Sequence, residues 1–248
     1  MRVKGIIGLV MVWGASVSLA LAEEKTIPMP HCDERMQGAG KSHKMMRLFQ
    51  SVPPQKATIL QSGKAKAFCP ECGMTLSMFF KTNHSGKIEG KAEQFCSIHC
   101  LVKALKQGKK IEDIQVVDTT SLAFIDAKKA YYVVGSHKRG TMTRVSKYAF
   151  AKKADAQAFM AKNGGDLTNF EGALKEATAD FPKDTQMVAK KQMTMAKKGE
   201  ILYGKMCRPT TQTFASTAEA KAFVLSEKLC KPLNGKQLQA IGLYLQHR

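Results

Sequence analysis

The residues E-Q-F-C-S-I-H-C-L-V-K-A-L-K-Q-G-K-K-I-E-D-I-Q-V-V-D, 93–118, contain three predicted elements in succession. The stretch Glu93–Cys96 predicts a strand, and Ser97–Gln107 has the apolar spacing of a helix. Gly108 then marks a turn, and Ile114–Asp118 predicts a second strand. The order strand, helix, strand indicates a helix that packs on one face of a small sheet.

A later part of the chain repeats this order. Lys147–Phe150 predicts a strand, Asp155–Lys162 a helix, Gly164-Gly165 a turn and Asp166–Phe170 another strand. Because internal repeats decide the fold class where they occur, we interpret this similarity as a duplication of one structural unit.

Each half also has an earlier strand candidate, at Leu76–Lys81 in the first half and at Ala130–Val134 in the second. The core, residues 56–178, is therefore predicted to be α+β and to consist of two strand-strand-helix-strand units. Residues 23–55 are polar and interrupted by prolines, which predicts an extended arm. Residues 179–198 are rich in lysine and are interpreted as a basic linker.

Residues 1–22 have the features of a cleaved export signal. Arg2 and Lys4 form a basic start, Gly5–Leu21 is an uncharged apolar run, and A-L-A at 20–22 is a small-residue cleavage pattern. The alternative is a retained membrane anchor, although the apolar run is shorter than the roughly 20 residues that a spanning helix needs. We expect a periplasmic protein.

The cysteine count agrees with an oxidising compartment, where disulfides persist. The first cysteine, Cys32, lies ten residues past Ala22, so we do not expect a lipoprotein. An odd number of cysteines means that at least one thiol is free, bound to metal or paired with another molecule. The seven cysteines are Cys32, Cys69, Cys72, Cys96, Cys100, Cys207 and Cys230.

The charge limits the classes of partner. The formal net charge is +19, and it falls to +17 when Arg2 and Lys4 leave with the signal. Such a surface favours acidic proteins or anionic lipid head groups, or serves solubility alone, and export argues against nucleic acid. The sequence contains no G-x-S-x-G, phosphate-loop or H-E-x-x-H motif, so we expect a protein that is not an enzyme.

Two cysteine motifs indicate a metal or redox site. C-P-E-C-G-M, 69–74, is followed by F-C-S-I-H-C, 95–100. Residues three and four apart share a helix face, so Cys96, His99 and Cys100 can present sulfur and nitrogen together. Thiolate, thioether and imidazole are ligands of Cu(I), whereas closed sets of cysteines also suit zinc.

Four interpretations of these motifs are open. In a thioredoxin-like redox centre the first cysteine pair would lie at the start of a long helix. Gly73 follows the pair at once and disfavours such a helix. Structural disulfides, for example Cys69–Cys72 and Cys96–Cys100, are a second reading. A four-cysteine zinc site and a copper site are the third and fourth, and we favour copper.

The chain resembles the NosL family, the accessory proteins of nitrous oxide reductase, over roughly residues 65–175. The ordered motifs are C-P-E-C-G-M, F-C-S-I-H-C-L, V-V-D (116–118), F-I-D-A-K-K-A-Y-Y-V-V-G-S (124–136), Met142, Ala149-Phe150 and N-G-G-D (163–166). The cysteine part is also similar to the short heavy-metal-binding modules of the TRASH type.

This resemblance implies a periplasmic Cu(I) metallochaperone that helps to deliver copper to nitrous oxide reductase, its expected partner. It also implies two similar strand-strand-helix-strand units. Carried over by position, the metal-binding candidates are Cys69, Cys72, Met74 and Met142. Asn163 stands where a histidine would be expected, and the extra thiols could compensate for it.

The last segment, residues 199–248, resembles the opening and closing helices of a small cytochrome c domain. Because C-x-x-C-H is absent, we expect no haem. Helices are predicted at Ala196–Met206, Thr217–Leu229 and Gly235–Gln246, with capping boxes at Ser216/Glu219 and Asn234/Gln237.

Cys207 and Cys230 are expected to form a disulfide, because the segment is too small to have much core. A copper site at Met193, Met195, Met206 and Cys207 is an alternative for this segment.

The sequence therefore predicts a copper chaperone. The rival from another class is a periplasmic thiol-disulfide oxidoreductase that keeps the cysteines of copper proteins reduced. It predicts rapid exchange with glutathione and a lowered pKa at Cys69 or Cys72. A third class, an interaction module with structural disulfides, predicts neither metal binding nor exchange.

Overall fold

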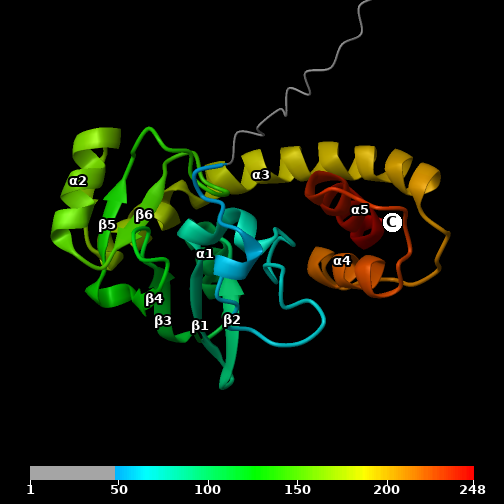
Figure 1. The fold of residues 1–248 in the computed structure, drawn as a ribbon, viewed down its shortest axis with the longest axis horizontal. Helices are drawn as coiled ribbons and strands as arrows, with labels where there is room; N and C mark the ends of the chain where they lie inside the picture. The colour runs from blue at the N-terminus through cyan, green and yellow to red at the C-terminus, as the bar shows by residue number, and fades with distance from the viewer. Residues whose placement is uncertain (1–47) are drawn as a thin grey trace, which may run out of the picture. The chain divides into compact units, whose positions relative to one another are not determined.

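The computed structural model describes residues 48–248, so the predicted signal and most of the predicted arm lie outside the described residues. The first sheet is antiparallel with the strand order β2-β1-β3-β4. Figure 1 shows this sheet beside the helix α1, Ile98–Lys106. Its strands are β1 (His84–Ile88), β2 (Lys91–Phe95), β3 (Glu112–Val117) and β4 (Phe124–Asp126).

The second sheet repeats the topology of the first. Its antiparallel order is β6-β5-β7, and the helix α2, Lys153–Asn163, connects β6 to β7 as α1 connects β2 to β3. The strands are β5 (Tyr131–Val134), β6 (Lys147–Phe150) and β7 (Asp166–Thr168). The predicted pair of strand-strand-helix-strand units is therefore confirmed, with β4 as an additional edge strand of the first unit.

One predicted strand is wrong. Leu76–Lys81 lies in a 3₁₀ helix, Leu76–Thr82, in which Leu76 and Phe80 are fully buried. Their spacing of four residues fits one helical turn better than an alternating strand. The strand of the first unit is instead β1. Its polar sequence and the central Gly86 lack the apolar alternation that predicts a strand. A Cβ at Gly86 would overlap the side chain of Ile111, so glycine is required there.

The predicted basic linker at 179–198 is also wrong, because these residues belong to the long helix α3, Phe170–Met206. Alanine, lysine, glutamine and methionine dominate this stretch, and all four favour helix. Asn169 caps the helix by accepting a hydrogen bond from the Gly172 N–H. Pro182 lies inside the helix.

The two carboxyl-terminal helices pack together, and the second of them packs on α3. The helices α4, Thr217–Ser226, and α5, Gly235–His247, lie against each other, and α5 also packs along α3 (Figure 1). The capping box of Asn234 and Gln237 is confirmed. Ser216 accepts from the Glu219 N–H as predicted, but the Glu219 carboxylate accepts from Ala215.

The predicted disulfide between Cys207 and Cys230 is present. It joins the end of α3 to the residues that follow α4, with a sequence separation of 23 residues. In the chain-entropy model a loop of this length contributes about 3 kcal/mol to stability. Cys207 is thereby removed from the alternative copper set that included it.

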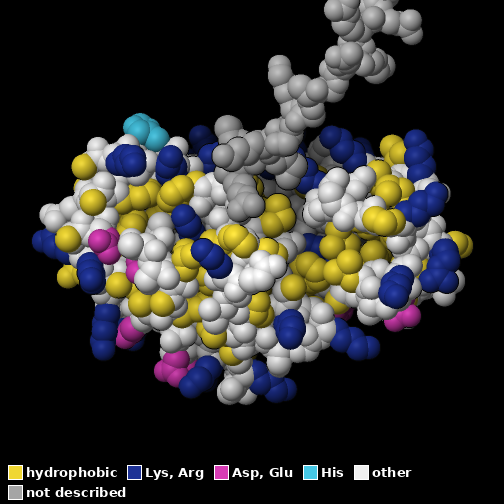
Figure 2. Space-filling view, viewed as in Figure 1, with side chains coloured by type: hydrophobic (Ala, Val, Ile, Leu, Met, Phe, Trp, Pro, Cys, Tyr) yellow, Lys and Arg dark blue, Asp and Glu magenta, His cyan; other side chains and the backbone are white. Residues whose placement is uncertain are grey.

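No helix within residues 48–248 combines the length and the hydrophobicity needed to cross a membrane. Figure 2 shows lysine and arginine side chains spread over the viewed face, where acidic side chains are fewer. This distribution agrees with the strongly positive net charge of the sequence.

The buried His84 connects the two units and predicts how stability depends on pH. Its Nδ1 lies 3.1 Å from the Thr82 carbonyl oxygen, and its Nε2 lies 3.2 Å from the Tyr132 hydroxyl. Burial lowers the pKa of His84 to about 4, whereas an unfolded histidine titrates near 6.5. Between these values the unfolded state binds a proton that the folded state does not. The free energy of unfolding should therefore fall by about 3 kcal/mol as the pH falls through this window.

Urea unfolding at several pH values between 7 and 4 measures this loss. The His84→Gln variant, which lacks a group that titrates in this range, should have a shallower dependence on pH. An equally steep dependence in the variant would show that His84 is not the responsible group.

Candidate functional site

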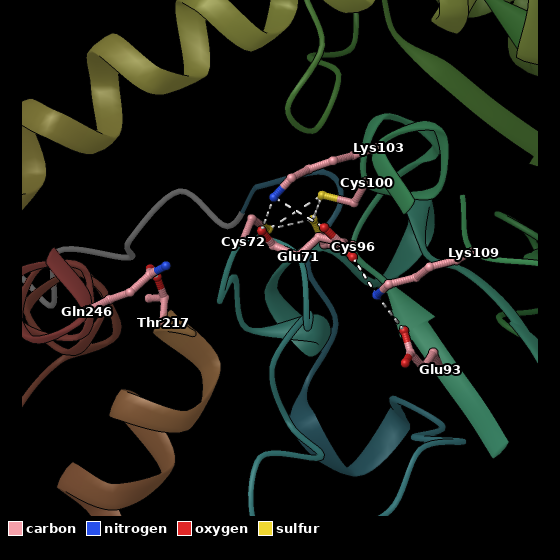
Figure 3. Close-up of polar contacts among 9 residues, drawn as sticks. All are labelled: Glu71, Cys72, Glu93, Cys96, Cys100, Lys103, Lys109, Thr217 and Gln246. Carbon is pink, nitrogen blue, oxygen red and sulfur yellow. Dashed lines mark hydrogen bonds and ion pairs between the residues drawn. The ribbon is translucent and has the colours of Figure 1, made fainter. Parts of the chain in front are cut away.

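Four cysteines converge at one buried point. The Sγ atoms of Cys72 and Cys96 are 3.4 Å apart, those of Cys96 and Cys100 are 3.7 Å apart, and those of Cys72 and Cys100 are 3.6 Å apart. Including Cys69, all four sulfurs lie within 4.8 Å of one another. None of the four residues is more than 5% exposed. We call this group the cysteine cluster; Figure 3 shows three of its members.

The first two cysteines lie in a tight loop that its own backbone stabilises. The Cys69 N–H donates to the Met74 carbonyl at 2.9 Å, and the Gly73 N–H donates to the Cys69 carbonyl at 2.8 Å. Gly73 has φ +70°, a left-handed conformation that suits glycine. The loop does not continue into an α-helix, unlike the start of a thioredoxin-like redox helix.

The other two cysteines come from the junction of β2 and α1. Cys96 directly follows β2, and Cys100 lies in the first turn of α1, one helical turn later. His99 points elsewhere: its ring stacks on Phe181 of α3 with the centroids 4.9 Å apart. Its Nδ1 is buried without a hydrogen-bond partner. The structure therefore brings together four of the predicted ligands and places His99 outside this group.

The two predicted methionine ligands lie in a neighbouring space. Met74 and Met142 both line one cavity of about 480 Å³. Gln239 of α5 lines the same cavity and donates to the Cys72 carbonyl at 3.1 Å. The cavity therefore lies beside the loop that carries Cys72, although no cysteine of the cluster lines it.

The pKa of Cys69 shifts in the opposite direction to those of Cys96 and Cys100. Burial raises the pKa of Cys69, but hydrogen bonds with Cys100, Cys72 and Cys96 outweigh it and leave the pKa well below the usual value. A hydrogen bond with Cys100 lowers the pKa of Cys96, but those with Cys69 and Cys72, together with burial, leave it well above. The Cys100 pKa is raised by hydrogen bonds with the other three cysteines. A bound metal cation would displace the protons that the thiols of the cluster hold.

A buried lysine from the carboxyl-terminal segment holds the cysteine loop. Lys221 of α4 is fully buried, and its Nζ donates to the Gly73 carbonyl at 2.6 Å and to Gln239 Oε1 at 2.8 Å. The ammonium also lies 4.1 Å from the ring centroid of Phe68. Burial lowers the pKa of Lys221 to about 7, while the nearby thiols oppose this shift. Sequence reasoning missed this residue, although a lysine inside the apolar run A-K-A-F-V was a signal.

Glu71, between the two cysteines of the loop, connects the loop to α1. Its side chain is only 5% exposed and forms ion pairs with Lys103 at 3.2 Å and Lys109 at 2.8 Å (Figure 3). Lys109 also lies 3.5 Å from Glu93 of β2. Sequence reasoning missed this network, because nothing in the local pattern of Glu71 indicates its burial.

Comparison with known proteins supports the resemblance to the NosL family over part of the chain. Residues 61–178 match the model of the NosL family. A similar solved structure is that of the copper chaperone NosL from Shewanella denitrificans, which is 26% identical. The match covers 48% of this chain and 96% of that chain, with a TM-score of 0.37. No curated protein matches the chain. The resemblance of residues 199–248 to cytochrome c stays a prediction.

Proposed function

We propose that the protein is a periplasmic copper chaperone that binds Cu(I) and assists copper-site assembly in nitrous oxide reductase. The match of residues 61–178 to the model of the NosL family supports this proposal. One observation carries the metal-binding part of this proposal, namely the four buried thiols within 4.8 Å of one another. This spacing allows one ion to contact several sulfurs at once.

The donor set suits the proposed cargo. Thiolates are soft ligands that select Cu(I), and the thioethers of Met74 and Met142 lie in the adjacent cavity. Four thiolates would also satisfy Zn²⁺ in tetrahedral geometry. More sulfurs than a low-coordinate Cu(I) ion needs would let an acceptor replace them one at a time, which supports a transfer role.

The positive surface supports the proposed partners. Because the formal net charge is +17 once Arg2 and Lys4 have left with the signal, association with an acidic face of nitrous oxide reductase, or with its assembly proteins, would be accelerated at low ionic strength. The same charge would favour an anionic membrane surface. We do not propose nucleic acid as a partner.

Transfer of copper tests the proposed function. The full chain is loaded with one equivalent of Cu(I) under anaerobic conditions and mixed with copper-free nitrous oxide reductase. We expect copper to move to the enzyme faster than from a Cu(I)–glutathione complex of equal concentration. Chain and enzyme are separated, and the copper content of each is measured. Transfer no faster than from glutathione would contradict the assembly role.

The same protein tests the redox rival. Burial keeps water and small thiols away from all four sulfurs, so we expect slow exchange with glutathione redox buffers. Mass spectrometry after alkylation measures the exchange. Rapid formation of a Cys69–Cys72 disulfide in these glutathione buffers would favour the oxidoreductase instead.

A further inference from the structure

The cavity beside the cysteine cluster is rich in methionine. Its lining includes four thioethers, those of Met74, Met142, Met187 and Met195. The first two belong to the NosL domain, whereas Met187 and Met195 lie on α3 beyond residue 178. The family resemblance thus assigns no role to this second pair.

Met187 and Met195 share the inner side of α3. They are eight residues apart, about two helical turns, and both are partly buried. Met193 lies on the same helix but is 65% exposed and does not line this cavity. Packing of α3 therefore separates two methionines that face the cavity from one that does not.

Contacts of α3 with the NosL domain fix these methionines opposite Met142. Asp184 is fully buried, and its Oδ1 accepts from the Arg144 N–H at 2.9 Å. Asp184 precedes Met187 by three residues, and Arg144 follows Met142 by two. Met142 has φ +60°, an uncommon left-handed conformation for a residue with a side chain. Such backbone strain persists where the surrounding structure holds it, often at functional sites.

The cavity adjoins the cysteine loop, although none of the four cysteines lines it. Met74 is part of the cysteine loop, since its carbonyl accepts from the Cys69 N–H. Gln239 bridges the cavity and the Cys72 carbonyl. The four methionines are partly exposed, whereas the four cysteines are buried.

We propose that Met187 and Met195, together with Met74 and Met142, form a second, outer Cu(I) site through which copper reaches the cysteine cluster. This inference rests on the proposed copper function. Neutral thioethers bind Cu(I) without losing a proton. Transfer inward would exchange thioether–copper bonds for thiolate–copper bonds, release the thiol protons to solvent and leave copper as Cu(I).

The positive charge of the cavity lining favours transfer of copper from the methionines to the cysteine cluster. Arg139, Arg144 and Lys191 also line the cavity, whereas acidic side chains are absent from its described lining. Cations near a neutral ligand set weaken the binding of Cu(I), so the outer site should hold copper less tightly than the thiolates do. Copper would therefore occupy the cysteine cluster first at equilibrium.

Two readouts on the full chain test the outer site. The first is the anaerobic Cu(I) stoichiometry of the parent, of Met187→Leu/Met195→Leu and of the matched control Met193→Leu. The second is the NMR signal of ¹³C-methyl-labelled methionines during the titration, assigned with the same variants. We expect two equivalents for the parent and the control but one for the double variant. The methyl signals of Met187 and Met195 should shift with the second equivalent, and that of Met193 should not.

The outcomes separate the two proposals. Two equivalents bound by the double variant, or no shift of the Met187 and Met195 methyl signals, would overturn the outer site while leaving the copper chaperone intact. If the parent binds no Cu(I), the proposed function itself fails and the outer site fails with it.

Discussion

Replacement of Cys96 by serine is expected to lower the affinity of the chain for Cu(I) by more than about 100-fold, since even groups behind the ligands of metal sites cost 10–100-fold. The Sγ of Cys96 lies within 3.7 Å of two other cysteine sulfurs, so its loss opens the centre of the cysteine cluster. A serine hydroxyl is a poor ligand for a soft cation. Competition with a chromophoric Cu(I) chelator measures the change.

The matched control removes sulfur outside the cluster. The double variant Cys207→Ser/Cys230→Ser loses the disulfide and should be less stable, but it keeps all four thiols. At a temperature where circular dichroism shows both proteins folded, only Cys96→Ser should lose affinity. Equal affinity of Cys96→Ser and the parent would exclude the cysteine cluster as the tight site.

Gly73→Ala is expected to be the most disruptive single substitution in the cysteine loop. Gly73 has φ +70°, and an alanine in this conformation costs about 1 kcal/mol. An added Cβ would lie 2.5 Å from Cγ2 of Thr217 at the start of α4, a clash that adds about 2 kcal/mol. We therefore expect the free energy of unfolding to fall by about 3 kcal/mol in total. Urea unfolding measures it.

Gly90→Ala is the control for this substitution. Gly90 in the turn between β1 and β2 has φ +74°, but no atom lies within 4 Å of an added Cβ. It should therefore lose only the conformational part, about 1 kcal/mol. Similar losses at both glycines would mean that α4 does not pack on the cysteine loop as the structure describes.

The repeated units were predictable because their strongest signals are local. Tyr131–Val134 and Lys147–Phe150 are short apolar strands bounded by turns, and α1 has a clear apolar face. Leu76–Thr82 was misassigned, because a run of apolar residues this short does not distinguish a strand from a helical turn. The polar β1 is a strand because its neighbours pair with it, a tertiary effect that no local pattern shows.

The candidate site likewise has a part that local motifs predict and a part that depends on tertiary packing. The spacing predicted that Cys96 and Cys100 lie close together, although Cys96 precedes α1 and does not share a helix face with Cys100. The two motifs together indicated four thiols. The contribution of α3, α4 and α5 could not be predicted. Lys221 contacts the loop from almost 150 residues away in the sequence, because Gly73 and Lys221 meet only when α4 packs on the cysteine loop.

X-ray absorption at the copper edge tests the central claim most directly. The full chain is reduced, loaded with one equivalent of Cu(I) and passed over a desalting column under anaerobic conditions. The cysteine cluster predicts that copper stays with the protein and that its neighbours are sulfur atoms alone, with no imidazole signal, since His99 faces Phe181. Loss of copper on the column, or a first shell of nitrogen and oxygen, would contradict the assignment of the four cysteines as the copper site.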